Sequence, residues 1–144
     1  AMKLAHAQGR APVHHPMPKF SYVIDLSPTE AAYLAGIIDG EGTIGKDFNR
    51  NTYRLTIGNT NKALLNWLYD RLGGRIKAKK VREGRTPMYY WVCNEMYVVA
   101  QILSAVEPYL IVKKDKAKEA IDSLWQTIEQ YLEPPDEFKA FPGQ

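Results

Sequence analysis

The chain has 144 residues, of which 45% are hydrophobic and 24% charged, and its formal net charge is +3. These values are typical of one globular domain with a hydrophobic core and exclude an intrinsically disordered chain. No apolar run approaches the roughly 20 residues that span a bilayer and no secretory signal is evident, so we expect an intracellular protein without a membrane partner. The single Cys93 excludes an internal disulfide and is expected to fill the core.

Prolines interrupt the first 25 residues, which show no apolar periodicity and are predicted to form an irregular arm. The three histidines of this arm make a poor metal site, because no cysteine or acidic residue neighbours them: His6, His14 and His15. Residues 26–133 are predicted to form the domain, and residues 134–144 a C-terminal tail.

The first predicted helix covers residues 28–40, because Ser27 and Glu30 form a capping box around a proline at the first helical position. Its apolar and small residues leave almost no polar face, so burial on most sides is expected. The helix nevertheless ends in Asp39 and Glu41 among glycines, where basic residues are usually favoured.

Two strands follow, over residues 43–48 and 52–58, joined by a turn at residues 49–51. In the second strand apolar residues alternate with polar ones, which gives the strand a core face and a partly basic face. A second helix, capped by Asn59 or Thr60, runs to Leu72 with a buried stripe of Leu64, Trp67, Leu68 and Leu72.

A second hairpin is predicted from residues 75–82 and 88–93, with a turn at residues 83–85. Ile76 and Ala78 are expected to face the core. A third helix, capped by Asn94, runs to Val106, and a fourth covers residues 114–132. The order predicts an α+β fold, αββαββα, with a four-stranded antiparallel sheet and helices on one face.

The opposite face of this sheet is predicted to be polar and basic, and two interpretations of it remain open. Strands that carry Arg, Lys, Thr and Tyr can lie in a DNA major groove and contact base edges. Alternatively, the face is simply exposed to solvent, as in many antiparallel sheets. Clustering of the basic residues favours a polyanionic partner: Arg75, Lys77, Lys79, Lys80, Arg82 and Arg85, then Lys113, Lys114, Lys116 and Lys118.

The two carboxylates at the helix-to-strand junction allow a hard-oxygen metal site, suited to a Mg²⁺ ion that retains several waters. A plain turn explains the same residues, because Asp39 to Gly42 is also a good turn sequence. Lys113 is a candidate phosphate contact because the apolar segment before it fixes its position.

Residues Leu34–Gly42 resemble the signature of the LAGLIDADG homing endonucleases, with Ile37, Gly40 and Glu41 as variants. The resemblance extends over most of residues 27–132 and includes the Asn59–Asn61 helix start and the Pro108–Lys113 segment. It implies a DNA-cleaving fold in which a saddle-shaped sheet covers the DNA.

The resemblance also implies roles for individual residues. Glu41, with the carbonyl of Gly40, matches the ligands of the catalytic Mg²⁺, a site that Mn²⁺ or Ca²⁺ can occupy in vitro. Asn61 matches a residue that organises active-site water, and Lys113 the basic residue near the scissile phosphate. Asp39 matches a more structural acidic position at the helix end.

A single copy of the motif implies a C2 homodimer, a palindromic or pseudopalindromic double-stranded DNA target and cleavage that leaves 3′ overhangs. The implied dimer interface consists of Leu34, Ala35, Gly36, Asp39 and Gly40. The implied DNA-facing residues are Asp47, Thr52, Arg54, Thr56, Arg75, Lys77, Lys79, Tyr90 and Val92.

Two other functions fit the same sequence. Related domains serve as RNA maturases that assist intron splicing, or as DNA-binding regulators without nuclease activity. An ordinary α+β interaction domain with a solvated sheet is the third interpretation, and it predicts no DNA affinity at low salt.

Overall fold

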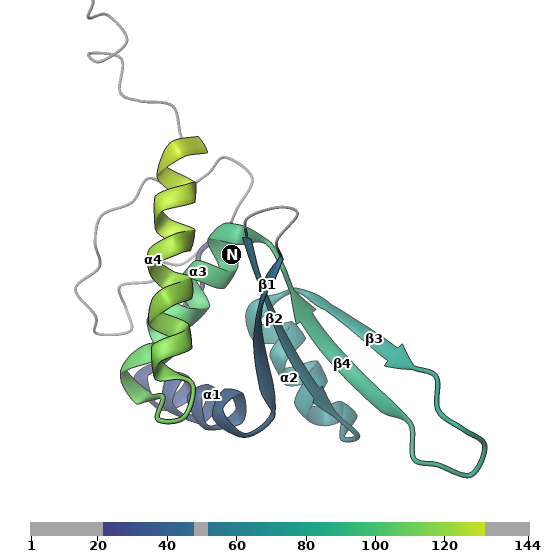
Figure 1. The fold of residues 1–144 in the computed structure, drawn as a ribbon. Helices are drawn as coiled ribbons and strands as arrows, with labels where there is room; N and C mark the ends of the chain where they lie inside the picture. Colours follow the sequence, from purple (N-terminus) through teal and green to yellow (C-terminus); the bar gives the residue numbers. More distant parts are fainter. Residues whose placement is uncertain (1–21, 48–51, 132–144) are drawn as a thin grey trace, which may run out of the picture.

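The computed structural model describes residues 22–47 and 52–131 (Figure 1). The arm histidines, the predicted turn at residues 49–51 and the C-terminal tail lie outside this part of the chain. Helices and strands alternate along the described residues in this order: α1 (Pro28–Glu41), β1 (Gly42–Asp47), β2 (Thr52–Asn59), α2 (Lys62–Leu72), β3 (Arg75–Lys79), β4 (Met88–Cys93), α3 (Met96–Val106), the 3₁₀ turn η2 (Glu107–Tyr109) and α4 (Lys114–Tyr131).

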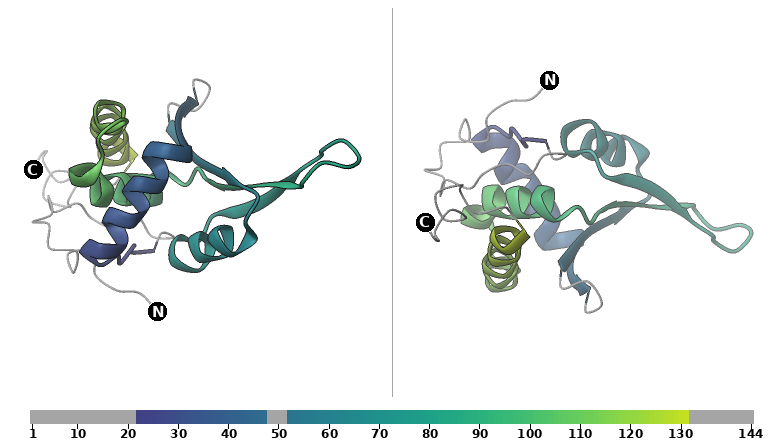
Figure 2. Two further views of the ribbon diagram at one scale, coloured as in Figure 1. Left: turned by 90° about the horizontal axis from the view of Figure 1, so that it is seen from below. Right: turned by 90° about the horizontal axis from the view of Figure 1, so that it is seen from above.

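The strands form one open antiparallel sheet in the order β1-β2-β4-β3, which confirms the predicted α+β fold. The helices cover one face of the sheet, and the β3–β4 hairpin projects beyond them (Figures 1 and 2). The two hairpins meet where β2 pairs with β4, so their outer faces form one continuous surface.

The face of the sheet toward the helices carries the core. Leu55 and Ile57 are fully buried there, as the alternation in the second strand predicted, and so is Trp91 of β4. Ala78, which was also expected in the core, is exposed, and Ile76 is only partly buried. Both lie on the projecting hairpin, where the helices give little cover (Figure 2).

Two predicted helix caps were wrong by one or two residues. Asn61, not Asn59 or Thr60, caps α2, because its Oδ1 accepts the backbone N–H of Ala63 at 2.9 Å. Glu95, not Asn94, caps α3, and its carboxylate accepts the N–H groups of Tyr97 and Val98. Strand β3 ends at Lys79, three residues before the predicted end.

Residues 22–25, which were assigned to the N-terminal arm, belong to the domain. The Tyr22 hydroxyl donates to the Leu72 carbonyl at 2.7 Å, and burial raises the pKa of Tyr22 to about 12. The buried Gln101 side chain donates to the Tyr22 carbonyl and accepts the N–H of Ile24, which is 1% exposed. The apolar periodicity misses this segment because it is extended and too short to repeat.

Helix α1 was expected to be buried on most sides, but only one stripe of it is buried in the described part of the chain: Ala31, Leu34, Ala35 and Ile38. Its outer side is exposed and apolar or small, with Ala32, Tyr33, Gly36 and Gly40. The described residues therefore leave a second, apolar or small-residue face of α1 uncovered.

The core contains Cys93, as predicted, and burial raises the pKa of this thiol to about 11. A thiol with such a pKa is largely protonated at neutral pH and is a poor nucleophile. Among the described residues, no helix combines the length and hydrophobicity needed to cross a bilayer.

Candidate active site

The junction between α1 and β1 places the acidic end of the motif at the edge of the sheet. The chain passes from Glu41, the last residue of α1, directly into Gly42, the first of β1. A Cβ atom at Gly42 would lie 2.9 Å from the Cα of Ile38, so glycine is required there. This close approach fixes where the helix ends and therefore where the side chain of Glu41 begins.

The carboxylate of Asp39 binds three consecutive backbone N–H groups in the segment before α4. Oδ2 accepts from Ile111 at 2.8 Å, and Oδ1 accepts from Val112 at 3.1 Å and from Lys113 at 3.0 Å. Burial acts to raise the pKa of Asp39, but these hydrogen bonds outweigh it, and the pKa is lowered. Asp39 therefore ties the end of α1 to residues 111–113 as a carboxylate.

Lys113 belongs to the same junction. Its ammonium donates to the main-chain carbonyl of Asp39 at 2.8 Å, so the side chain lies against the last turn of α1. Lys114 instead pairs with the Glu107 carboxylate at 2.9 Å. This pair accounts for one of the cations at the start of α4, which the helix dipole disfavours.

Glu41 is exposed and its Oε2 accepts a hydrogen bond from the Asn59 side-chain amide at 2.7 Å. The Oδ1 of the same amide accepts the backbone N–H of Asn61 at 2.7 Å. We had expected Asn59 only as a helix cap, so its contact with Glu41 was missed. A paired Asn-x-Asn at the end of a strand was the available signal, but the sequence does not show which carboxylate lies opposite.

The structure thus bonds Lys113 to Asp39 and Asn59 to Glu41, two residues apart at the end of α1. Asn61 lies one step further away, and its side-chain oxygen is used to cap α2. Within residues 22–47 and 52–131, no group of three or more His, Cys, Asp or Glu side chains could hold a metal ion.

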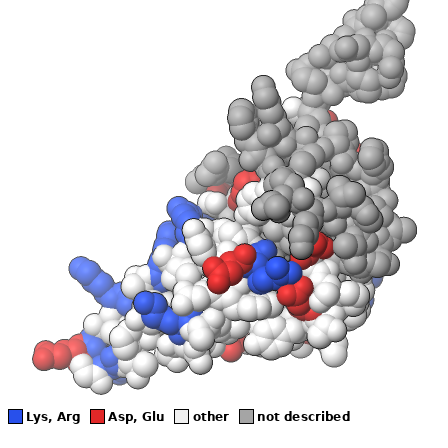
Figure 3. Space-filling model, turned by 180° about the vertical axis from the view of Figure 1, so that it is seen from behind, with Lys and Arg blue, Asp and Glu red and all other residues white. Residues whose placement is uncertain are grey.

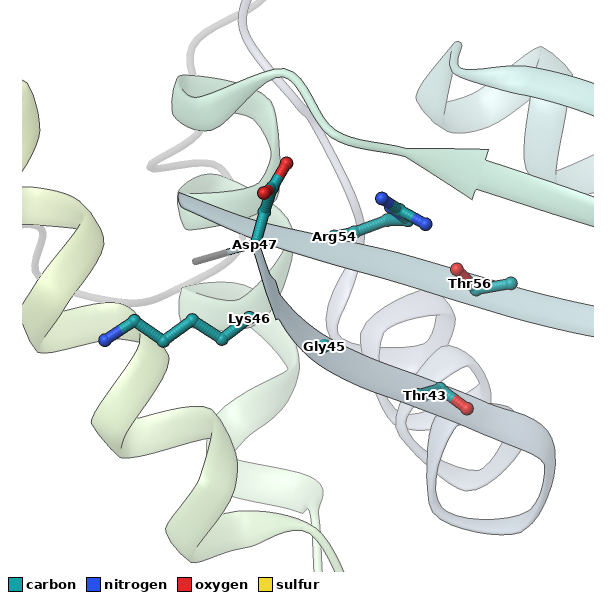
Figure 4. A pocket seen from close by; sticks show the side chains of 6 residues that line it. All are labelled: Thr43, Gly45, Lys46, Asp47, Arg54 and Thr56. Atoms are coloured by element: carbon teal, nitrogen blue, oxygen red, sulfur yellow. The ribbon is translucent and has the colours of Figure 1, made fainter. Parts of the chain in front are cut away.

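The strand register gathers the predicted DNA-facing residues on the sheet face away from the helices. Thr43 lies opposite Thr56, Thr56 opposite Val92, and Val92 opposite Arg75, so one row crosses all four strands. Figure 4 shows Arg54 and Thr56 beside Thr43 on the neighbouring strand, with Asp47 at the strand end. A second shallow hollow continues across the hairpin, lined by Arg54, Thr56, Arg75, Lys77, Ala78, Lys79, Tyr90, Val92 and Asn94.

Two of the predicted contact residues on this face are mostly covered. Thr52 and Val92 are each only 7% exposed, and the Thr52 hydroxyl oxygen is buried. We therefore correct the prediction for Thr52, whose hydroxyl is not presented at the surface. Val92 still lines the hollow, but it offers only a small apolar contact.

The cations of this face are exposed: Arg54, Arg75, Lys77 and Lys79. The ring of Tyr90 occupies the space that a side chain at Gly58 would take, so the aromatic group lies on the surface of the sheet. Figure 3 shows the opposite side of the molecule, where Lys and Arg side chains also lie over the projecting end. The face and the hairpin form a positively charged surface.

The predicted dimer interface divides into three kinds of residue. Leu34 and Ala35 are 0% exposed inside their own protomer, so they are not available to a partner and that part of the prediction is corrected. Asp39 is engaged with residues 111–113. Gly36 and Gly40 are exposed, and a Cβ at either position would meet nothing within 4 Å.

A model of the LAGLIDADG-like domain matches residues 28–119 of the chain. Comparison with curated protein sequences gives no match. Solved structures share the fold, including the homing endonuclease I-CvuI in complex with the I-CreI target in the presence of Mg. Its identity is 23% and its TM-score 0.51, over 71% of this chain and 67% of that one.

Two other solved structures agree. The homing endonuclease I-TnaI is 17% identical with a TM-score of 0.53, over 74% of this chain and 76% of that one. The meganuclease I-SmaMI bound to uncleaveable DNA is 19% identical with a TM-score of 0.53, and 89% of this chain covers 47% of its length. At these identities the likeness establishes the homing endonuclease fold.

Proposed function

The chain belongs to the family of LAGLIDADG-like domains, and from this premise we propose that it is a homodimeric, Mg²⁺-dependent, site-specific DNA endonuclease. The observation that carries the proposal is that Lys113 bonds to Asp39, two residues before Glu41 at the end of α1, beside a continuous basic sheet face. A sheet face that is only exposed to solvent does not explain why Lys113 donates to the main-chain carbonyl of Asp39. The structures of I-CvuI and I-SmaMI, which contain DNA, support the same assignment.

The donor set of this junction fits a water-rich divalent ion. Asp39 is committed to three N–H groups, whereas Oε1 of Glu41 accepts no hydrogen bond from the described residues. Gly40 lies in the last turn of α1, where main-chain carbonyls lack intrahelical partners. One carboxylate with a carbonyl and DNA phosphate oxygens suits Mg²⁺, which keeps several waters.

Each residue of the site then has a defined task. A bound divalent ion would supply an activated water and neutralise charge on the phosphate being cleaved. Glu41 and the carbonyl of Gly40 would hold that ion at the sheet edge. The ammonium of Lys113 would stabilise the charge that develops on the scissile phosphate, and the free amide N–H₂ of Asn61 would orient water.

The exposed side of α1 supports the dimer. Gly36 and Gly40 are one helical turn apart, and small residues at such spacing allow a second helix to approach closely. Beside them, residues that Asp39 holds in place present exposed apolar side chains, with Ile111 84% and Val112 75% exposed. Two copies related by a two-fold axis would bring two Glu41 residues together, cut opposite strands of a palindromic or nearly palindromic site and leave 3′ overhangs.

Selection of cleaved sites from a random double-stranded DNA library with Mg²⁺ tests the proposal. We expect a single, nearly symmetric site, cut on both strands. Glu41→Gln should abolish cleavage while DNA affinity stays within a few-fold, because the change removes a charge without changing shape. Full cleavage by this variant, or no selected site with the wild-type protein, would refute the proposal.

A further inference from the structure

We infer that Asn59 is a positioning residue that presents Glu41 to the metal ion and thereby sets the affinity of the site for that ion. The inference rests on the proposed metal-dependent endonuclease function. It starts from the pair of 2.7 Å hydrogen bonds that the Asn59 amide makes, one to Glu41 and one to the backbone of Asn61. Neither bond follows from the family motif, since Asn59 lies 18 residues beyond Glu41.

The direction of the Asn59 amide is fixed by chemistry. A backbone N–H can only donate, so the atom of Asn59 that faces the Asn61 N–H must be the oxygen. The NH₂ group is then on the side of Glu41, whose ionised carboxylate can only accept. The bond from Asn59 to Glu41 is therefore a charge-assisted hydrogen bond with one possible polarity.

The backbone around Asn59 is well placed to hold this amide. Asn59 ends β2, where it pairs with Tyr89 of the central neighbour strand β4. The acceptor bond from Asn61 joins the same amide to the first turn of α2 through a residue that itself caps the helix. Asn59 is thus attached to both the sheet and a helix, whereas Glu41 is an exposed side chain at a helix end.

As a consequence, the two carboxylate oxygens of Glu41 are no longer equivalent. Oε2 is occupied by Asn59, so Oε1 is the oxygen left for a metal ion, and Glu41 is set up as a ligand through one oxygen. Without Asn59 the side chain would sample several rotamers and would lose entropy on binding. Partners that orient a metal-binding carboxylate are typically worth about 10- to 100-fold in metal affinity or activity.

The first experiment measures cleavage of the selected DNA site against Mg²⁺ concentration. Asn59→Ala removes both bonds of the amide. Asn59→Ser keeps an oxygen that can accept the Asn61 N–H, but it places no N–H group near Glu41. Thr60→Ala changes the next, exposed residue of the same turn and serves as the matched control.

For both Asn59 variants we expect the half-saturating Mg²⁺ concentration to rise by about tenfold or more. The cleavage rate at saturating Mg²⁺ should recover to within a few-fold of wild type. The DNA Kd without divalent ions and the melting temperature of Asn59→Ser should stay at their wild-type values, and Thr60→Ala should match wild type throughout. A normal Mg²⁺ requirement in Asn59→Ser would show that the turn, rather than the donor to Glu41, is what matters, and would overturn the inference.

A second measurement uses Mn²⁺ alone, without DNA, and follows the electron paramagnetic resonance signal of free Mn²⁺ as protein is added. Asn59→Ser should bind Mn²⁺ about tenfold or more weakly than wild type, as Glu41→Gln should. Equal Mn²⁺ affinity in Asn59→Ser and wild type would overturn the inference whatever the cleavage data show. Weakened Mn²⁺ binding together with no DNA cleavage by the wild type would instead refute the proposed function and leave the role of Asn59 intact.

Discussion

The three hydrogen bonds that Asp39 accepts allow a quantitative prediction of how much Asp39→Asn lowers the free energy of unfolding. The amide has the shape of the carboxylate but no charge. Its oxygen can still accept from Val112 and Lys113, whereas its NH₂ group would face the N–H of Ile111, which now donates to the other carboxylate oxygen. The change therefore removes one hydrogen bond and the charge assistance of two others.

The magnitude follows from these three bonds. A hydrogen bond to a charged group contributes about 1.5–3 kcal/mol and a neutral one about 0.5–1.5, so losing one charged bond and reducing two others to neutral bonds sums to about 5 kcal/mol. Asp39 is partly exposed and water can replace much of what is lost, which reduces the expected loss to about 2 kcal/mol. For a domain of this size, that corresponds to a melting temperature lower by about 8 °C.

The loss should depend on pH in a defined direction. The folded-state pKa of Asp39 lies below its ordinary value of about 3.9, so the carboxylate contributes stability above that value and loses it as the pH falls through the folded-state pKa. Protonated Asp39 resembles the asparagine of the variant. The difference between wild type and Asp39→Asn should therefore be complete at about pH 7 and shrink toward zero at low pH, once the pH has fallen through the folded-state pKa.

Urea unfolding at fixed protein concentration, at both pH values, measures this difference. Glu41→Gln makes the same chemical change two residues away, and we expect it to alter stability by less than about 0.5 kcal/mol because Glu41 is exposed. A stability gap for Asp39→Asn that is absent at neutral pH, or equally large at low pH, would refute the reasoning.

Two further predictions concern the exposed surfaces. Gly36→Leu should leave the protomer folded, because nothing lies within 4 Å of its Cβ position, but sedimentation should show monomers. As a contrast, Gly42→Ala should destabilise the protomer by about 1–3 kcal/mol through its contact with Ile38. A Gly36→Leu protein that still forms dimers would contradict the proposed interface. Lys77→Ala should weaken DNA binding and lower the slope of log affinity against log salt by about 1, whereas Lys118→Ala on α4 should change neither. Equal slopes for wild type and both variants would argue against phosphate contact by Lys77.

Much of the fold was predictable because local patterns and tertiary packing agree. The alternation of residues 52–58 and the capping box at Ser27 follow from short-range periodicity, and both appear in the structure. The exposure of Ala78 was not predictable, because it depends on how far the hairpin extends past the helices. Helix caps were missed where two polar residues competed, as at Asn59 and Asn61, and the sequence alone does not show which side chain has another partner.

The candidate site was predictable in part. The motif indicates Asp39 and Glu41 as a pair, but only the structure shows that their environments differ. Asp39 is saturated by N–H groups from residues 72 to 74 positions later in the chain, whereas Glu41 has one amide partner. Contacts of such long range leave no periodic signal, and the role of Asn59 depends on one of them.

The anchoring of residues 22–26 has a consequence for the order of folding during synthesis. Their hydrogen bonds reach partners 46 to 79 residues downstream, in α2 and α3. Ile24, almost completely buried in the finished domain, therefore cannot make its bond to Gln101 until α3 has left the ribosome. Long-range contacts of this kind form slowly, so the first part of the domain to be translated is expected to be among the last to dock.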